Sequence, residues 1–371
     1  MGIALYRKYR PQKLADLLGQ DANIAILQNA ARTERLGHAY LFYGPRGSGK
    51  TTMARLLAKL LNCETRRTDA AFREMGEPCN ACEACREIEM GNAFDVIEID
   101  AASNRGIDEI RNLKESIVVA PTKARYKVYI IDEAHMLTPP AFNALLKTLE
   151  EPPRHAILIL ATTEYEKLPP TITSRTQRFA FKKLSKLVII KKLVKIAAEE
   201  HIATSEDALE LIAAIAEGSL RDAESLLDQL GSLGKPITLQ AVEELTGRVG
   251  FRKVISLAKL IAANDLKGSL AYLTELQEEG HNFVQFTRDL IHYMRKVLML
   301  SLNPTAASLL ATDITEDELV QIKTLAANAD THFLATLIKT LIRAYSEMRY
   351  SPFAMIPLEV ALVEHLKERS I

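Results

Sequence analysis

The sequence predicts an α/β domain built on a parallel sheet, followed by a small helical domain and a larger all-helical domain. Short apolar stretches alternate with helical ones up to about residue 180, which is the pattern of parallel strands joined by helices. A glycine-rich motif of the form G-x-x-x-x-G-K-[ST] stands between the first apolar stretch and a helix. Beyond residue 180 the strand pattern disappears, and apolar residues recur at helical spacing, as in "FLATLIKTLIRAY".

The elements of the first part can be assigned in order. The segment "TPPAFNALLKTLEEPP" predicts a helix, because Thr138 can cap it, Pro139 suits its first position and Pro152 stops it. Between the helical segments, short apolar runs predict five strands, at residues 39–43, 94–99, 127–131, 155–161 and 178–181. We therefore expect three parts, at residues 1–180, 181–243 and 244–371.

Composition and charge exclude some classes of protein. The 371 residues are 48% hydrophobic with a mean hydropathy of −0.01, which is enough apolar material for two or three cores. The apolar runs are too short to span a bilayer, and the first residues do not read as a signal peptide, so we expect a cytoplasmic protein with no membrane contact. Lys plus Arg and Asp plus Glu number 47 each, so any contact with DNA should be local and depend on assembly.

The loop "GPRGSGKT", residues 44–51, matches the glycine-rich motif at every fixed position. Its glycines let the backbone turn N–H groups toward phosphates, and the following helix adds its positive end. Lys50 is expected to balance the charge of the β- and γ-phosphates, and Thr51 to offer its hydroxyl to Mg²⁺. An ordinary glycine-rich turn is the alternative, which the strand before the loop and the helix after it disfavour.

An acidic pair follows the third predicted strand. The run "KVYIIDEAH" carries Asp132 and Glu133 to the carboxyl end of the strand, where α/β sheets bind ligands. We expect Asp132 to hold the magnesium shell and Glu133 to orient or deprotonate the attacking water. A cap for a following helix is the alternative. The next strand ends at Thr162 and Thr163, whose hydroxyls can reach the γ-phosphate or the water, although threonine is common at strand ends.

Two arginines stand at places where they can stabilise charge on a phosphate. Arg175 lies in "PPTITSRTQRF", just before the last predicted strand. Arg221 lies in "EGSLRDAESLLDQ", where Ser219 and Asp222 form a capping box that puts Arg221 in the first turn of a helix. Either arginine can act on the γ-phosphate of its own site or of a neighbour's. A surface salt bridge is the ordinary alternative for each of them taken alone.

The cysteines predict a metal site. All four fall within residues 63–85, in the pattern C-x15-C-x2-C-x2-C, and the first of them ends the helix that follows the glycine-rich loop. Four thiolates can close a tetrahedral structural zinc site, and no ligand position then stays open for catalysis. A disulfide pair or free structural thiols are the alternatives. The expected zinc ligands are Cys63, Cys79, Cys82 and Cys85.

Taken together, these motifs resemble the gamma/tau family of bacterial DNA polymerase III, the clamp-loader motors of the AAA+ class. The resemblance covers essentially the whole chain and depends on "YRKYRPQKLADLLGQ", the glycine-rich loop, the cysteine insertion, "IDAAS", "IDEAHML", "FNALLKTLEEPP", "ATT", "LPPTITSR" and "EGSLRDA". The insertion is the most specific of these features. The resemblance implies an AAA+ P-loop core with an inserted zinc knuckle, then a helical lid, then a helical collar.

The resemblance also implies roles at matching positions. Lys50, Glu133 and Arg175 would be catalytic, with Arg175 as a finger inserted into a neighbour's site. Thr163 would be the sensor on the third strand, and Arg221 the second sensor. The residues implied to bind ATP are Gly44, Pro45, Arg46, Gly47, Ser48, Gly49, Lys50, Thr51, Thr52, Asp132, Thr163 and Arg221.

The resemblance also implies other binding residues, and the chain departs from the family's pattern at two places. By analogy, the segment Tyr6–Gly19 would lie near the adenine, and Thr51 with Asp132 would hold Mg²⁺. The family usually has Ser-Arg-Cys where this chain has Ser-Arg-Thr around Arg175, which keeps the arginine and changes only local packing. The gap before the second cysteine is also longer than usual. Whether the chain is a natural short form or part of a longer protein stays open.

The implied function is an ATPase of DNA replication that opens a sliding clamp and loads it on primed DNA, with ATP, Mg²⁺ and Zn²⁺ as cofactors. The implied partners are other clamp-loader subunits, joined in a hetero-oligomeric ring through the collar, the sliding clamp and primer–template DNA. The alternatives are another AAA+ DNA motor and a ring-building scaffold without turnover. A candidate DNA contact is "ASNRGIDEIR", where Ser103 and Asn104 precede a helix start and Arg105 adds charge; a solvated loop is the alternative.

Overall fold

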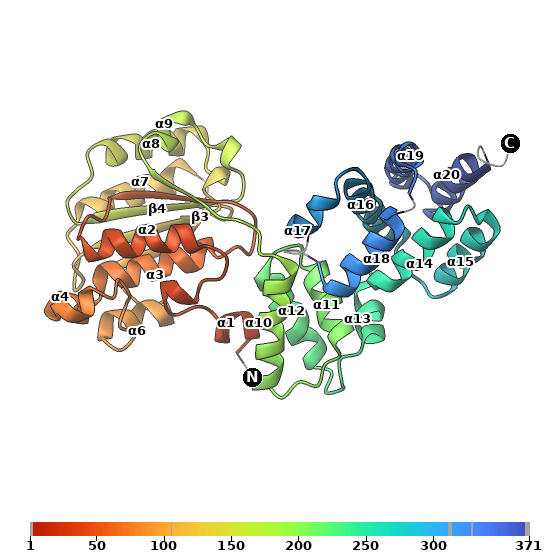
Figure 1. The fold of residues 1–371 in the computed structure, drawn as a ribbon. Helices are drawn as coiled ribbons and strands as arrows, with labels where there is room; N and C mark the ends of the chain where they lie inside the picture. The colour runs from red at the N-terminus through yellow and green to blue at the C-terminus, as the bar shows by residue number, and fades with distance from the viewer. Residues whose placement is uncertain (1–2, 105, 311–313, 328, 368–371) are drawn as a thin grey trace. The chain divides into compact units, whose positions relative to one another are not determined.

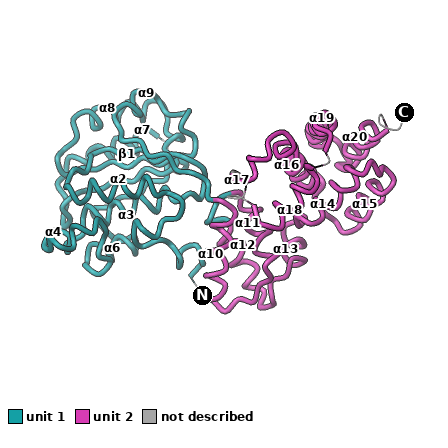
Figure 2. Tube along the Cα trace, viewed as in Figure 1, with its two compact units in different colours: residues 1–184, 218–222 teal, residues 185–217, 223–371 magenta. Residues whose placement is uncertain are grey.

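The computed structural model describes residues 3–104, 106–310, 314–327 and 329–367. The chain forms two compact units, which Figure 2 distinguishes by colour. Unit 1 comprises residues 1–184 and 218–222, and unit 2 comprises residues 185–217 and 223–371. Each unit has a hydrophobic core of its own.

Unit 1 is built on a parallel sheet with the strand order β2-β3-β4-β1-β5 (Figure 1). The predicted strands are all present; β1 has the predicted bounds, and the ends of the others differ from the predicted ones by at most two residues. Every residue of β4 is buried, as expected for a central strand with helices on both faces. The strands are β1 (Ala39–Tyr43), β2 (Val96–Asp100), β3 (Lys127–Asp132), β4 (Ala156–Thr162) and β5 (Gln177–Ala180).

Alternate strand residues feed two cores, one on each face of the sheet. Tyr40 and Phe42 pack in the core that includes helices α2 (Asp21–Arg32) and α3 (Lys50–Asn62). Leu41, between them in sequence, packs in the opposite core with helices α7 (Ile107–Val118) and α8 (Pro139–Glu150). Figure 1 shows these two helix pairs on the two sides of the sheet. This arrangement follows from the two-residue period of a strand.

The remaining elements of unit 1 are short, apart from α7 and α8. The predicted helix after Thr138 begins at Pro139 as expected, although the Thr138 side chain makes no capping hydrogen bond. These elements are α1 (Leu5–Lys8), η1 (Leu14–Asp16), α4 (Glu64–Thr68), α5 (Ala70–Arg73), α6 (Glu83–Met90), α7 (Ile107–Val118), η2 (Ala134–Met136), α8 (Pro139–Glu150), η3 (Tyr165–Lys167) and α9 (Pro170–Thr173).

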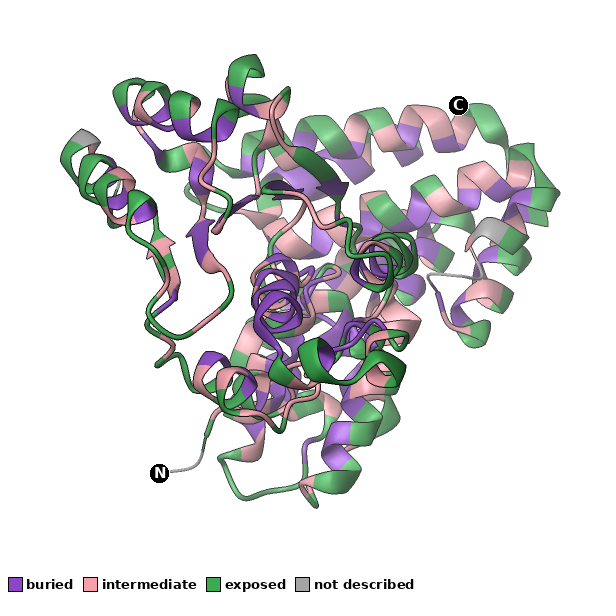
Figure 3. Cartoon of the chain, turned by 90° about the vertical axis from the view of Figure 1, so that its left-hand side faces the viewer, coloured by how far each residue is buried: buried purple, intermediate pink, exposed green. Residues whose placement is uncertain are grey.

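Unit 2 is helical, and Figure 3 shows buried and exposed residues alternating along its helices, so that each packs one face inward. None of the described helices is long and apolar enough to cross a membrane. The helices are α10 (Lys186–Glu199), α11 (Glu206–Ile215), α12 (Leu220–Gly231), α13 (Leu239–Thr246), α14 (Phe251–Ala262), α15 (Leu266–Glu278), α16 (Phe283–Leu302), η4 (Pro304–Ala306), α17 (Ala307–Leu310), α18 (Glu316–Ala327), α19 (Thr331–Met348) and α20 (Met355–Lys367). The first residues of α12 belong to unit 1.

Candidate nucleotide site and cysteine cluster

The loop between β1 and α3 has a backbone that only glycine adopts easily. Gly44, Gly47 and Gly49 have φ angles of 141°, 71° and 99°. Space is also short, because a Cβ on Gly47 would lie 1.9 Å from the Ser219 hydroxyl oxygen, and one on Gly44 would lie 2.3 Å from the Phe181 carbonyl oxygen. The loop is therefore curled and closely surrounded, as a phosphate cradle has to be.

Lys50 begins α3 and reaches back across the loop. Its Nζ donates to the carbonyl oxygens of Gly44 and Pro45, each at 2.9 Å. Burial lowers the pKa of Lys50, while the nearby carboxylates of Glu133 and Asp132 act in the opposite direction. The ammonium group is thus held inside the loop, where an anion would be well placed to pair with it.

Hydrogen bonds link the ends of β3 and β4 to the start of α3. Thr51 donates from Oγ1 to Asp132 Oδ2 at 2.7 Å, and the Glu133 N–H donates to Asp132 Oδ1 at 2.9 Å. Thr163 donates from Oγ1 to Glu133 Oε2 at 3.0 Å. Glu133 has a φ of 47°, a strained conformation of the kind found at functional sites. The structure therefore brings Lys50 and these four residues to one edge of the sheet.

The donor types at this edge suit magnesium. Hydroxyl and carboxylate oxygens are the ligands that Mg²⁺ prefers, and the Thr51 and Asp132 oxygens lie side by side. A bound magnesium ion would supply charge neutralisation at the β- and γ-phosphates. These two residues are the ones that fit as its protein ligands.

His135 also belongs to this site, and sequence reasoning missed it. Its side chain is 7% exposed, and its Nδ1 lies 3.0 Å from Thr162 Oγ1 and 3.5 Å from Glu133 Oε2. Its Nε2 lies 3.1 Å from Glu164 Oε1. A hydrogen bond from Lys167 lowers the pKa of Glu164, which keeps that carboxylate ionised beside the imidazole. The available signal was the position of His135 two residues after Glu133 in "DEAH".

Arg221 lies in the first turn of α12, as the sequence predicts. Its guanidinium carbon is 4.9 Å from the centre of the Tyr6 ring. Ser219 Oγ accepts from the Asp222 N–H at 3.3 Å, which is the hydroxyl half of the expected capping box, and Arg46 Nη2 lies 3.9 Å from Asp222 Oδ1. Residues 218–222 are part of unit 1, so the start of this helix packs beside the glycine-rich loop.

Arg175 lies near the amino ends of the strands, opposite the carboxyl ends where the glycine-rich loop lies. The glycine-rich loop follows the carboxyl end of β1, where Tyr43 pairs with Ala180 in the parallel strand β5. Arg175 precedes the amino end of β5. Its Nε and Nη2 donate to Glu150 Oε1 at 2.9 and 2.5 Å, and its Nη1 donates to the Thr171 carbonyl oxygen at 2.9 Å. The structure therefore does not bring Arg175 to the loop of its own chain.

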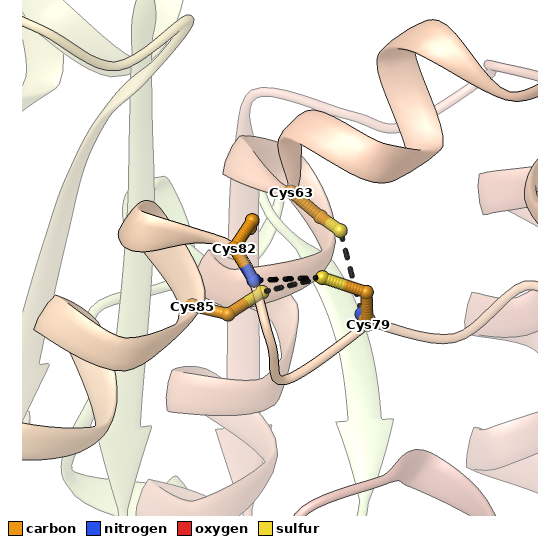
Figure 4. Close-up of side chains that lie close together, drawn as sticks. All are labelled: Cys63, Cys79, Cys82 and Cys85. Carbon is orange, nitrogen blue, oxygen red and sulfur yellow. Dashed lines mark hydrogen bonds between the residues drawn. The ribbon is translucent and has the colours of Figure 1, made fainter.

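The four cysteines converge between the end of α3 and the start of α6 (Figure 4). Their sulfur atoms all lie within 4.8 Å of one another, and none forms a disulfide. Backbone N–H groups point at the sulfurs: that of Cys79 donates to Cys63 Sγ at 3.4 Å, and that of Cys82 donates to Cys79 Sγ at 3.2 Å. Amide donors of this kind stabilise thiolates, so the cluster is able to hold a metal ion.

The candidate DNA contact has a different geometry from the one expected. Ser103 and Asn104 precede the start of α7 at Ile107, as expected, but their N–H groups are not free, because both donate to the Asp100 carbonyl oxygen. The first turn of α7 carries Asp108 and Glu109, which repel a phosphate at that helix end. Arg105 lies outside the described residues. We therefore place no DNA contact at this helix start.

Models of three protein families match successive parts of the chain. "DNA polymerase III, delta subunit" matches residues 19–185, "DNA polymerase III clamp loader subunit, ATPase lid domain" matches residues 188–235, and "DNA polymerase III subunits gamma and tau domain III" matches residues 237–369. The first match covers the strands of the parallel sheet, and the other two cover the helices that follow it.

Individual proteins match over nearly the whole chain. DNA polymerase III subunit tau of Bacillus subtilis is 42% identical over 97% of this chain and 62% of its own length. Subunit tau of Escherichia coli is 40% identical over 98% of this chain and 55% of its own length. Subunit gamma of Buchnera aphidicola is 36% identical over 98% of this chain and 98% of its own length. The chain thus spans little more than half of the tau relatives and almost all of the gamma relative.

Proposed function

The chain belongs to the gamma/tau family of DNA polymerase III subunits, and we propose from this premise that it is an ATP-driven motor subunit of a clamp loader. In this function it opens a sliding clamp and places it on primed DNA, using ATP binding to hold clamp and DNA and hydrolysis to release them. For a bacterial replication protein, this role places it in the cytoplasm.

One observation carries the proposal, namely the convergence of a lysine, a hydroxyl and two carboxylates at the carboxyl edge of the sheet. Lys50 would hold the β- and γ-phosphates, and Thr51 with Asp132 would hold magnesium. Glu133 would take a proton from the attacking water, with Thr163 fixing its carboxylate. Each role suits the side chain: an ammonium group pairs with phosphates, oxygen atoms bind magnesium, and a carboxylate accepts a proton.

The two arginines would act on the nucleotides of different subunits. Arg221 lies beside the loop of its own chain, which supports a role in closing over its own nucleotide. Arg175 lies at the far edge of the sheet, which supports a role in a neighbour's site. A guanidinium supplied to a neighbour stabilises charge that develops on the transferring phosphoryl group.

The proposed parts of the chain are an AAA+ core at residues 1–180, a lid at 181–243 and a collar at 244–371. The ranges of the three family matches support these boundaries. The collar would join this chain to other clamp-loader subunits in a ring, and the assembled ring would bind the clamp and primer–template DNA. The balanced charge of the chain supports a DNA affinity that appears only after assembly with ATP.

We also propose that the cysteine cluster holds one structural zinc ion. Four thiolates match the preferred ligands of zinc, and no position would stay open for water. Metal analysis of freshly purified protein should find about one equivalent of zinc, and Cys79→Ser should lower this content and the thermal stability of unit 1. Protein that is folded and free of zinc would refute this part of the proposal.

The experiment that tests the function is clamp loading by the reconstituted complex with purified clamp and primed DNA. We expect ATP hydrolysis to rise when clamp and primed DNA are both present. Hydrolysis stimulated by branched DNA and indifferent to the clamp would indicate another AAA+ DNA motor. Stable nucleotide binding without turnover in the complete complex would indicate a scaffold.

A further inference from the structure

The amino-terminal segment, residues 5–19, packs against the glycine-rich loop. A Cβ placed on Gly49 would lie 2.8 Å from Leu17 Cδ2, so the Leu17 side chain covers the last turn of the loop. The Tyr6 ring stacks on Arg221 at the same site. Contacts that hold this segment in place therefore also affect the shape of the nucleotide site.

Glu77 of the cysteine insertion holds the segment directly. Its side chain is buried, and its two carboxylate oxygens accept from the backbone N–H groups of Leu14 at 2.7 Å and Ala15 at 2.9 Å. The Gln28 amide adds a third hydrogen bond at 2.7 Å. A buried carboxylate that accepts three N–H donors makes strong, charge-assisted contacts, and its loss would leave those backbone donors without a partner.

A second set of contacts surrounds Lys59, which is 2% exposed on α3. Its Nζ donates to Gln12 Oε1 at 2.7 Å, to Asn80 Oδ1 at 3.1 Å and to Glu89 Oε2 at 2.6 Å. The Asn80 amide in turn donates to the Gln12 carbonyl oxygen at 2.8 Å. Gln12 belongs to the amino-terminal segment and Asn80 to the insertion, so the two are joined here as well.

Both contacts are made by residues that adjoin a metal-binding cysteine. Glu77 lies two residues before Cys79, and Asn80 lies immediately after it with a φ of 57°. The backbone there has little regular structure of its own, since it lies between α5 and α6. A metal bound by the four sulfurs would fix the path of this stretch and so present Glu77 and Asn80 in the positions that the contacts need.

We propose that the cysteine insertion is a clip, set by its metal, that holds the amino-terminal segment against the glycine-rich loop and thereby strengthens nucleotide binding. This inference rests on the metal and nucleotide sites of the proposed function. It gives the insertion a task in nucleotide affinity, in addition to its own folding. By linkage, nucleotide should also hold the metal more tightly.

The first test leaves the metal in place. Glu77→Gln replaces one carboxylate oxygen with an N–H₂ group, which cannot accept, so at least one backbone N–H loses its partner and faces another donor while all four cysteines remain. We expect unchanged metal content, a dissociation constant for a fluorescent ATP analogue raised about fivefold or more, and faster amide exchange at Leu14 and Ala15. The matched control is Glu83→Gln, which removes the same charge from an exposed residue of the insertion that pairs only with Lys123 among the contacts seen. It should leave all three measurements unchanged.

A milder variant covers the case in which Glu77→Gln does not fold. Asn80→Gly removes the amide that contacts Gln12, and glycine suits the positive φ at this position. We expect it to weaken nucleotide binding about twofold to fivefold at normal metal content. Normal affinity in both variants would overturn the clip.

The second test removes the metal from the full-length chain with a chelator. We expect weaker binding of the ATP analogue, with affinity restored when zinc is added back, and slower release of zinc to the chelator when nucleotide is saturating. Equal affinity with and without metal would refute the clip even if the zinc site is real. Normal nucleotide binding by Lys50→Ala would instead refute the nucleotide site on which the proposal rests.

Discussion

The Thr51 hydroxyl donates to the Asp132 carboxylate at 2.7 Å, although the two residues are 81 positions apart in sequence. One stands in the first turn of α3, and the other ends β3. The parallel sheet makes this meeting possible, because it carries the ends of β1 and β3 to the same edge. The two oxygens are thereby fixed next to each other, which is the arrangement that a magnesium ion with few protein ligands requires.

Asp132→Asn should therefore weaken the binding of magnesium–ATP far more than the binding of ATP without metal. The amide keeps the shape of the side chain but removes the charge that attracts the ion, so about tenfold more magnesium should be needed for half-saturation. Titration of a fluorescent ATP analogue at several magnesium concentrations measures this. Asp100→Asn, at the end of the neighbouring strand, is the control. Equal losses with and without magnesium would contradict the assignment.

Glu133→Gln should bind ATP normally and lower hydrolysis by about 100-fold or more, because the amide cannot accept the proton of the attacking water. The Thr163 hydroxyl can still donate to the amide oxygen, so the site should keep its shape. Single-turnover hydrolysis in the assembled complex measures the chemical step, and the complex should stay trapped on clamp and DNA. Turnover at the normal rate would show that Glu133 is not the base.

His135→Ala should lower hydrolysis about tenfold while leaving nucleotide affinity unchanged, since the imidazole touches the Glu133 carboxylate and not the loop. His155→Ala is a matched control, because this half-buried histidine of unit 1 contacts the Ile117 carbonyl oxygen outside the site. The single-turnover rate and the dissociation constant, measured separately, distinguish the two effects. A loss of affinity without a loss of rate would mean that His135 supports folding of the loop only.

Lys50 should make nucleotide binding and stability respond to alkaline pH in opposite directions. Burial lowers its pKa below the ordinary value of 10.5, so the folded protein releases this proton at lower pH than the unfolded chain does. The free energy of unfolding should therefore rise between the lowered pKa and 10.5, while affinity for nucleotide falls as the ammonium charge is lost. Denaturant melts and binding titrations from pH 7 upward test both trends. Lys50→Met should abolish the rise in stability, and its persistence would contradict this origin.

Arg175→Ala should leave ATP binding by the isolated subunit intact and reduce DNA-stimulated hydrolysis in the assembly by about 10³-fold. The reason is its place at the edge of the sheet away from its own loop, where Glu150 now holds it. In mixed assemblies, hydrolysis should survive only where an intact Arg175 faces an intact Lys50. Arg178→Ala, an exposed arginine of β5, is the control. Loss of nucleotide binding by the Arg175→Ala monomer would refute the action in a neighbour's site.

Much of the fold and part of the site could be predicted because their signals are local. A few consecutive residues mark the glycine-rich loop and each of the strands β1 to β5, and a short spacing marks the cysteine cluster. Strand period and ligand spacing follow from backbone geometry. The acidic pair was predictable for the same reason, since a carboxylate at the end of an apolar strand must lie at the edge of the sheet. The N–H groups of Ser103 and Asn104 were expected to be free, but in the folded chain both donate to the Asp100 carbonyl oxygen.

Other features depend on which distant segments pack together, and no short pattern carries that information. No sequence pattern distinguishes Glu77 from other acidic residues. Its partners, the Leu14 and Ala15 N–H groups, come next to it only in the folded chain. His135 becomes a neighbour of Glu164 only because β3 and β4 are adjacent in the sheet. Hydrogen bonds are short and directional, so a partner is chosen by position in space to within a fraction of an ångström. Spacing along the chain sets which groups are available, and packing alone selects which of them meet.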